Sequence, residues 1–516
     1  MDFLTALAQR QPTHPAVVLG ERVLDYATLE ASSNRLANTL LALGISSGDR
    51  CTTIGYNAPE HSIVSSATRK LVMVGLPMNY RLNAEEIRYQ LDHSQSAIVF
   101  AGAQQVERVE QATACGACPE LRHKVCWGLE QAPQGWLRFE ELVSGGSDRP
   151  PPIESGLTGP SMTYTAGTTG NPKGAFRAQG TDPAVVKSYV RWFDLRPGDV
   201  HLVAGPLYHS APGAFATFNT ILGGTNVLLP RFDPAAAMAA IERHRVTTTF
   251  MAPILLQRIV RLAADQSLEE HGRSRYDVSS MRSIVMAAAP CPFEVKRRVI
   301  EMFGEVLYEF YGSSELGCNA VMRPQDQLRK PGSCGRPCDG VEIEVLDDEG
   351  RPLPPGEAGE LFIKSPQVIT SYWRNERATE EARRGELFSV GDVGYLDGEG
   401  FLYISDRKRD MVISGGVNVC TTEVEHAIHA HPDVWDVAVF GIPSDEWGES
   451  VHAVVQPQSG RRLDAEQLTT WLRPRLADYK LPRSIEIRSE LPRDDAGKIR
   501  KRDLREPFWQ DRTSRV

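Results

Sequence analysis

The sequence predicts an α/β protein with a large multi-subdomain N-terminal domain and a small α/β C-terminal domain. Three observations lead to this prediction. The chain has 516 residues, more than one hydrophobic core usually supports. Short apolar runs alternate with helix-like stretches over most of its length, which favours layered, largely parallel sheets. After residue 330 the pattern changes to short strands separated by turns, and this predicts a β-rich part.

The N-terminal elements follow from local patterns. Residues 1–15 resemble a short amphipathic helix, and residues 16–26 alternate apolar and polar around Gly20-Glu21, as a hairpin does. The next stretch has Leu and Ala at helical spacing and ends at Gly44. The buried strands that we expect farther along the chain lie at 96–102, 201–206, 246–253 and 282–290.

The C-terminal part begins after a charged cluster, "SDRKRD" at 405–410. A helix and a strand are predicted over 422–443, a strand over 452–457 and a helix over 465–476. About 105 residues suffice for a separate small domain. We therefore expect an N-terminal domain at 1–405, a connection at 406–410 and a C-terminal domain at 411–516.

Composition narrows the function. Lys and Arg number 57 against 66 Asp and Glu, a net charge of −9, so the chain is not an obvious nucleic-acid binder. No run of about 20 apolar residues could span a bilayer, and the N-terminus lacks a signal-peptide pattern. The "CGAC" at Cys115–Cys118 has no second CxxC and no suitably spaced His pair, so incidental cysteines are favoured over zinc or redox chemistry. A reducing cytoplasm is the expected location.

A stretch rich in Gly and Thr, "TYTAGTTGNPKGAF" at 163–176, is typical of a phosphate-binding loop. Glycines let successive backbone N–H groups converge on an anion, threonine hydroxyls add donors, and Lys173 adds a positive charge. It is not the common P-loop, because Gly174 stands where that motif requires Ser or Thr after the lysine. A plain Gly/Thr loop is the alternative for a motif of this kind.

Five motifs in a fixed order carry a resemblance to a known superfamily. They are "YTAGTTGNPKG" at 164–174, "PLYHSAPG" at 206–213, "YEFYGSSELG" at 308–317, "SVGDVGYLDGEGFLYISDRKRDMVISGGVNV" at 389–419 and "LPRDDAGKIRKRDLR" at 491–505. Together they resemble the adenylate-forming superfamily: acyl-CoA synthetases, peptide-synthetase adenylation domains and firefly-type luciferases. The resemblance covers essentially the whole chain and implies the adenylate-forming enzyme fold, with a mobile C-terminal domain.

The resemblance also implies an ATP site. In the reaction that the resemblance implies, a carboxylate attacks the α-phosphorus of ATP and pyrophosphate leaves. Both reactants are anions, so the site must neutralise their charge and hold them in line. Glu315 suits a magnesium ligand, with Thr165 beside it, because magnesium prefers one or two carboxylates plus phosphate oxygens. The nucleotide-binding residues that it implies are Thr165, Thr168, Thr169, Gly170 and Lys173 for the triphosphate, Tyr311 for adenine, Ser314 for the α-phosphate, Asp392 and Arg407 for ribose, and Ala289 and Gly312 as further cofactor-binding residues.

The same resemblance assigns the moving parts. Lys498 reaches the α-phosphate and carboxylate during adenylation, and His209 lines the acyl pocket as a gate for CoA. Arg409 occupies the hinge position about which the small domain rotates. The residues expected to contact CoA are Gly415 and Gly416, which leave room for its pantetheine arm, and Trp447 and Tyr479 for its nucleotide.

The acyl pocket is expected to be lined from 209–218, 250–253 and 286–291. These segments are small or apolar and contain no Lys or Arg, so dicarboxylates are disfavoured. Amino acids are disfavoured as substrates too, because the segment "PLYHSAPGAF" contains no Asp that could bind the amine. A lipophilic monocarboxylic acid is expected, such as a fatty acid or a steroid side-chain acid, with Phe215, Phe218 and Phe250 able to stack on an aryl ring instead.

Three functions stay open at this point. The first is an AMP-forming acyl-CoA synthetase of fatty-acid and lipid metabolism that uses ATP, Mg²⁺ and CoA. The second is an aryl-acid CoA ligase, or an acyl-AMP ligase that passes the acyl group to a carrier protein. The third is a binding protein that has lost activity, which the presence of Lys173, Glu315 and Lys498 argues against. The sequence leaves a homodimer open.

Overall fold

The computed structural model describes residues 2–165, 172–264, 269–270, 273–274, 276–289, 291–407, 411–414, 417–444, 447–494 and 497–509. Its N-terminal elements are those that the sequence predicts. Helix α1 (Phe3–Arg10) buries Leu4 and Leu7, and strands β1 (Pro15–Leu19) and β2 (Arg22–Asp25) form the antiparallel hairpin. Helix α2 (Tyr26–Ala42) begins where the Asp25 side chain accepts a hydrogen bond from Thr28 N–H.

The larger sheet starts with parallel strands. β1, β11, β10, β12, β15 and β16 lie side by side in that order and run parallel, with β2 antiparallel at the edge. Residues on β11, β12 and β15 are buried throughout, as strands covered on both faces should be. The elements here are α7 (Pro183–Trp192), β10 (Val200–Val203), α8 (Ser210–Ile221), β11 (Thr225–Leu228), α9 (Pro234–His244), β12 (Thr248–Met251), α10 (Pro253–Ala264), β15 (Ser283–Met286), α11 (Phe293–Phe303) and β16 (Leu307–Ser313).

A second sheet holds the phosphate-loop segment. Its order is β21-β9-β8-β4-β3-β5-β6-β7, with parallel pairing from β8 to β7 and antiparallel pairing of β8, β9 and β21. The bounds are β3 (Arg50–Ile54), α3 (Pro59–Lys70), β4 (Val74–Met78), α4 (Ala84–Ser94), β5 (Ser96–Gly102), α5 (Val106–Thr113), β6 (His123–Trp127), β7 (Leu137–Arg138), α6 (Phe139–Gly145), β8 (Ser161–Thr165), β9 (Lys173–Arg177) and β21 (Ser371–Tyr372).

The predicted β-rich part continues the larger sheet with antiparallel strands. Its elements are β17 (Gly317–Met322), β18 (Ser333–Pro337), β19 (Glu342–Leu346), β20 (Gly359–Lys364), α12 (Glu376–Glu381), β22 (Arg383–Arg384), β23 (Leu387–Phe388), β24 (Asp392–Leu396) and β25 (Leu402–Arg407). The fold is therefore α/β with an added antiparallel portion, as the sequence predicts.

The C-terminal elements form a sheet of their own. β26 pairs with β27 and β29, and β29 pairs with β28 and β30. Their bounds are β26 (Val412–Ser414), β27 (Val417–Val419), α13 (Thr421–His429), β28 (Val434–Ser444), β29 (Gly448–Pro457), α14 (Ala465–Leu472), β30 (Ser484–Ile487) and α15 (Lys501–Trp509). A separate buried cluster around Val424, Val439 and Leu468 is the core of this part.

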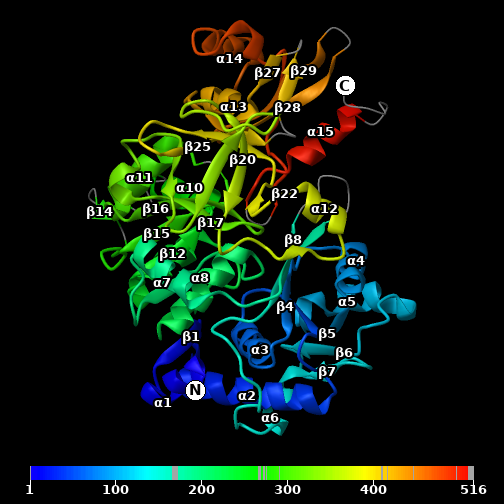
Figure 1. Cartoon of the computed structure of the whole chain (residues 1–516). Helices are drawn as coiled ribbons and strands as arrows, with labels where there is room; N and C mark the ends of the chain where they lie inside the picture. Colours follow the sequence, from blue (N-terminus) through cyan, green and yellow to red (C-terminus); the bar gives the residue numbers. More distant parts are fainter. Residues whose placement is uncertain are drawn as a thin grey trace.

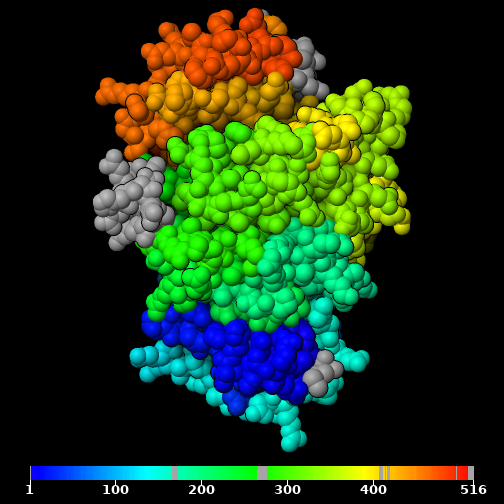
Figure 2. Space-filling model, turned by 90° about the vertical axis from the view of Figure 1, so that its left-hand side faces the viewer, coloured from blue at the N-terminus to red at the C-terminus, as the bar shows by residue number. Residues whose placement is uncertain are grey.

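The C-terminal elements sit at one end of the molecule. Figure 1 shows α13, α14, β28 and β29 at the end opposite α1 and α2, with β20 and β25 between them and the parallel strands. In the space-filling view the orange C-terminal residues cover one end of the green part of the N-terminal domain (Figure 2). The chain passes from β25, in the larger sheet, to β26, in the C-terminal sheet, between residues 407 and 412.

Candidate active site

A cavity of about 1160 Å³ lies where the two sheets of the N-terminal domain and the C-terminal part meet. β4, β8 and β9 of the second sheet supply one wall, and α8 with the ends of β12 and β16 supplies the other. Asp494 and Lys498 of the C-terminal part close one end. The cavity thus joins residues from all five motif segments that the sequence singles out.

Thr165, Lys173 and Glu315, which the sequence predicts to bind the triphosphate and magnesium, line the cavity together. Thr165 ends β8 and pairs in register with Lys173, the first residue of β9. The Thr165 hydroxyl donates to Glu315 Oε1 at 2.8 Å, and Lys173 Nζ lies 5.0 Å from the centre of the Tyr372 ring. These contacts hold a carboxylate and a cation side by side. Thr168, Thr169 and Gly170 lie outside the described residues.

The predicted adenine and ribose residues lie on three neighbouring strands or their connections. Tyr311 on β16 is buried and its hydroxyl donates to Asp392 Oδ2 at 2.7 Å. Asp392, the first residue of β24, stands opposite Arg407 at the end of β25. Gly312 lines the cavity, but Tyr311 and Asp392 are not among its lining residues. At the end of β15, Ala287 and Ala288 line the cavity and the predicted Ala289 does not. Ala288 has a φ of 82°, which is rare for alanine.

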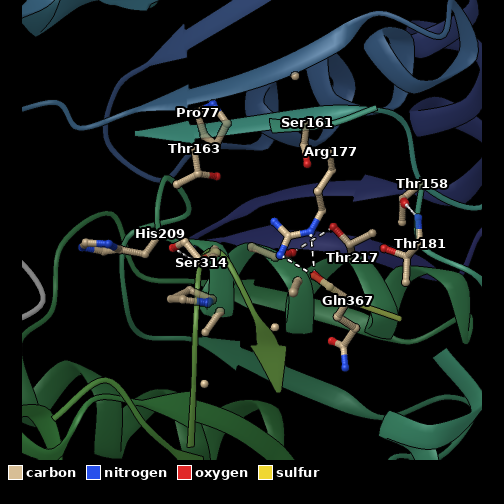
Figure 3. Close-up of a pocket in the computed structure, with 18 of the residues that line it drawn as sticks. Pro77, Thr158, Ser161, Thr163, Arg177, Thr181, His209, Thr217, Ser314 and Gln367 are labelled. Atoms are coloured by element: carbon tan, nitrogen blue, oxygen red, sulfur yellow. Dashed lines mark hydrogen bonds between the residues drawn. The ribbon is translucent and has the colours of Figure 1, made fainter. Parts of the chain in front are cut away.

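His209 and Ser314 face the cavity from opposite elements. His209 precedes the first residue of α8, and its ring lies 4.2 Å from that of Tyr208. The next residue, Ser210, hydrogen-bonds through its hydroxyl to that of Ser314 at 2.9 Å. This contact ties the start of α8 to the segment that carries Glu315, and both His209 and Ser314 line the cavity (Figure 3).

Lys498 enters the cavity on a turn that a second basic residue holds. Asp494 accepts a hydrogen bond from Lys498 N–H at 2.8 Å, and Gly497 N–H donates to Asp494 O at 2.9 Å. Arg493 Nη1 donates to Gly497 O at 2.9 Å, and its other end forms an ion pair with Asp436 of β28. The turn is thereby attached to the C-terminal sheet.

Gly497 is the point where this turn touches the N-terminal domain. Its φ is +80°, and a Cβ at this position would overlap the side chain of Ile254 in α10. Only glycine fits here without displacing Ile254. The backbone of Gly497 therefore packs directly against the Ile254 side chain, and the next residue, Lys498, lines the cavity.

The part of the cavity that the sequence predicts to hold the acyl group has aromatic side chains, which the sequence analysis gave as the alternative to an open pocket of small residues. Phe215, Phe218 and Phe250 line it, and two residues that the sequence analysis did not single out, Tyr189 and Phe310, join them. The Phe215 and Phe250 rings are stacked with centres 5.6 Å apart, and Tyr189 contacts Phe218 edge-on at 4.7 Å. Flat apolar surfaces of this kind suit an aryl or lipophilic group.

One expectation about this cavity is wrong. The segments 209–218, 250–253 and 286–291 contain no Lys or Arg, but Arg177 and Arg69 line the same cavity from β9 and α3. The error has a physical cause: β9 is a strand of the second sheet and α3 connects two of its strands, β3 and β4, so only the tertiary fold brings them to the same cavity as α8. The absence of a cation, on which the exclusion of dicarboxylates depended, does not hold.

The structure describes only some of the residues predicted for CoA binding and for the hinge. Gly415, Gly416 and Arg409 lie outside the described residues. Trp447 precedes β29 and carries the Arg483 guanidinium 4.3 Å above its ring, while Tyr479 is 48% exposed. Neither of these two aromatic residues lines the cavity. They stay predictions for CoA binding.

Other features of the described residues are simpler. Cys115 is exposed and Cys118 is buried, and no group of three or more His, Cys, Asp or Glu in the part of the chain that the structure describes could hold a metal ion. Within the same part, no helix is long and apolar enough to cross a membrane.

Comparison with known proteins gives a family for both parts of the chain. Residues 4–373 match the model of the AMP-binding enzymes, and residues 423–498 match the C-terminal domain of AMP-binding enzymes. The chain is 34% identical to a feruloyl-CoA synthase from Amycolatopsis over 97% of both chains. It is 33% identical to an indoleacetate–CoA ligase from Aromatoleum aromaticum, covering 98% of this chain and 97% of the relative.

Two further matches extend the range of relatives. A long-chain-fatty-acid–CoA ligase from Mycobacterium tuberculosis is 32% identical, covering 94% of this chain and 93% of the relative. The ATP-bound structure of MatB from Rhodopseudomonas palustris has a TM-score of 0.86 and 28% identity, covering 99% of both chains. The fold is therefore shared with an enzyme that binds ATP.

The fold, the site and these matches define the class: the chain belongs to the AMP-binding enzymes of the adenylate-forming superfamily. Within that class it is an AMP-forming acid–thiol ligase, of the acyl-CoA synthetase branch.

Proposed function

We propose that the protein activates a lipophilic carboxylic acid that carries an aryl ring, and transfers its acyl group to CoA. The observation that carries this proposal is the single cavity that has Thr165, Lys173, Glu315 and Lys498 at one end and aromatic side chains at the other. The relatives that act on ferulate and indoleacetate support an aryl acid.

The chemistry takes two steps. The carboxylate attacks the α-phosphorus of ATP, pyrophosphate leaves, and the acyl group is held as an acyl-adenylate. The thiol of CoA then attacks the acyl carbon, AMP leaves and the thiol proton is released. Lys173 and Lys498 bring positive charge to a site where two anions must approach each other.

Magnesium fits the residues at the phosphate end. The Glu315 carboxylate is buried at the cavity wall, and the Thr165 hydroxyl lies beside it at 2.8 Å. These oxygens would hold Mg²⁺ together with phosphate oxygens, and the ion would supply charge neutralisation for the triphosphate. Lys173 would stabilise the same charge from the side of β9.

A fatty acid is the second candidate. The wall of α8 facing the cavity includes Ala211, Gly213 and Ala214, whose small side chains leave room for a chain of methylenes. The fatty-acid relative supports this alternative. Acids of both kinds belong in one panel, assayed for pyrophosphate release with and without CoA, and for thioester formation. Preference for a saturated chain over every aryl acid would contradict the proposal, and so would activation without any CoA thioester.

Lys498→Ala tests the proposed catalytic role. We expect loss of at least about 100-fold in acyl-adenylate formation, because the cation that reaches the reacting groups is removed. Conversion of a supplied acyl-adenylate to the thioester should change little. Lys187→Ala is the matched control, since Lys187 is exposed on α7 and lies outside the cavity. Equal loss of both half-reactions would contradict the role of Lys498.

A further inference from the structure

Arg177 is a cation in the cavity that the reaction described above does not use. It ends β9, and its side chain extends between β8 and α8 into the cavity (Figure 3). Its Nε and Nη2 donate to Gln367 O at 3.3 and 2.8 Å, and Nη2 lies 3.5 Å from Glu315 O. These backbone carbonyls fix the guanidinium plane but supply no negative charge.

The charge of Arg177 has no counter-ion among the described residues. No carboxylate in that part of the chain lies within 4.0 Å of its guanidinium, whereas Arg69, the other arginine of the cavity wall, pairs with Asp2 at 2.6 Å. Burial lowers the pKa of Arg177, although Tyr189 and Glu315 act in the opposite direction. A half-buried cation held without a carboxylate is unfavourable, so a ligand that supplies a carboxylate gains the interaction.

Four carboxylates that line the cavity have hydrogen-bond or ion-pair partners of their own. Asp182 accepts from Ala184 N–H at the start of α7, and Glu315 accepts from the Thr165 hydroxyl. Glu360 accepts from the Ser389 hydroxyl at 2.7 Å, and Glu381 pairs with Arg377. None of them forms an ion pair with Arg177 within 4.0 Å, and Glu315 acts on it only through its charge at a longer distance.

The position of Arg177 suits the far end of a substrate. In the β8–β9 hairpin Thr165 pairs with Lys173 at the phosphate end, and Ser161 pairs with Arg177 at the other. Four residues of strand separate the two pairs by about 13 Å. Ser161, the strand partner of Arg177, and Thr217 of α8 also line the cavity, so its wall includes polar side chains besides the aromatic ones.

We propose that Arg177 binds a second carboxylate at the end of the acyl substrate opposite the carboxylate that is activated. The guanidinium presents its donors as a planar fork that matches a carboxylate. This inference rests on the proposed function and narrows it: the substrate is an aryl acid with an acidic group at its far end.

A matched pair of acids tests it. 3-(4-Carboxyphenyl)propanoic acid and 3-(4-methylphenyl)propanoic acid differ only in the group at the far end. We expect the native enzyme to prefer the first in kcat/KM for pyrophosphate release, and Arg177→Met to lower kcat/KM for that acid by about 10- to 100-fold. The methyl-substituted acid should change by less than about threefold. Arg177→Lys should retain part of the preference.

Arg191→Met is the matched control, because Arg191 lies on α7 with its side chain 61% exposed and pairs with Asp339 at the surface. Arg191→Met should leave kcat/KM unchanged for both acids. An equal effect of Arg177→Met on the two acids would overturn the inference, and so would a rise in KM for ATP or CoA alone. Pyrophosphate release measured without CoA separates the two proposals: selectivity there without later thioester formation would sink the CoA-ligase function and leave the role of Arg177 standing.

Discussion

At the scale of single residues, the turn that carries Lys498 depends on Arg493. The guanidinium joins Gly497 O on one side to Asp436 on the other, and Asp436 also accepts from His429 Nε2 at 2.9 Å. Burial tends to raise the pKa of Asp436, but His429 and Arg493 more than offset it and lower that pKa. The carboxylate therefore stays charged. We propose that Arg493 affects catalysis by positioning the turn that carries Lys498.

Arg493→Met removes this support without touching the cavity. We expect the adenylation half-reaction to slow by about tenfold or more, because small displacements of a catalytic group are costly. Thioester formation from a supplied acyl-adenylate should be nearly unchanged, and Arg493→Lys should restore part of the rate. Arg488→Met is the control: Arg488 pairs with Glu486 on the surface of the same domain. A parallel loss in both half-reactions would mean that Arg493 only stabilises the fold.

The sequence could identify some residues of this site and not others. Thr165, Glu315 and Lys498 stand in motifs, so their meeting in one cavity could be expected before the structure. Arg177 follows the phosphate-loop motif by only a few residues, yet nothing local indicates that it faces α8. Its orientation depends on the crossing of two sheets, which is a property of the tertiary structure.

At the scale of elements, α1 is fastened to α3 by buried charges. The Asp2 carboxylate, just before α1, forms ion pairs with Arg69 Nη1 at 2.6 Å and with Lys70 Nζ at 3.0 Å. Lys70 is 2% exposed and also contacts Glu30 of α2. The amphipathic pattern of residues 1–15 could predict the helix, but the charged contacts join three segments that are distant in sequence, and no local pattern indicates them.

Asp2→Asn should reduce acid sensitivity. Burial opposes ionisation of Asp2, but the bonds and charges of Arg69 and Lys70 lower its pKa from 3.8 to about 2. Because the folded-state pKa is the lower one, the stabilisation is complete above pH about 4 and is lost as pH falls toward 2. We expect a loss of about 2 kcal/mol in the free energy of unfolding at pH 7, and a smaller difference near pH 2.

Chemical denaturation at several pH values measures this difference. Asp148→Asn is the control, because its side chain is 63% exposed and lies 3.6 Å from Arg35. It should change stability little at any pH. A pH-independent loss in Asp2→Asn would contradict the charge-based explanation.

At the scale of the whole molecule, the cavity is completed by a part of the chain that belongs to another sheet. β25 ends in the larger sheet at Arg407 and β26 begins the C-terminal sheet at Val412. The charged cluster at 405–410 and the separate helix and strand pattern after it could predict two domains. They could not predict the arrangement of these domains that places Lys498 in the cavity wall. That arrangement depends on contacts such as Trp435 beneath the Arg261 guanidinium at 4.9 Å.

We propose that the C-terminal domain rotates about Arg409 between the two half-reactions. Arg409→Pro, which restricts the backbone at that position, should slow the complete reaction by about tenfold while each isolated half-reaction changes far less. Single-turnover rates of the two half-reactions and of the complete reaction check this prediction. If both halves fell together with the complete reaction, Arg409 would not be the hinge.

The close approach of Gly497 to Ile254 has a consequence for how the enzyme can vary. We expect the volume at residue 254 to affect how closely the turn around Gly497 packs on α10, because a Cβ at Gly497 would already overlap this side chain. A larger residue would hold them apart and a smaller one would loosen their fit, so the balance between conformations can be tuned at a position outside every motif. Differences in turnover between otherwise similar ligases could then arise from packing at this contact, with identical catalytic groups.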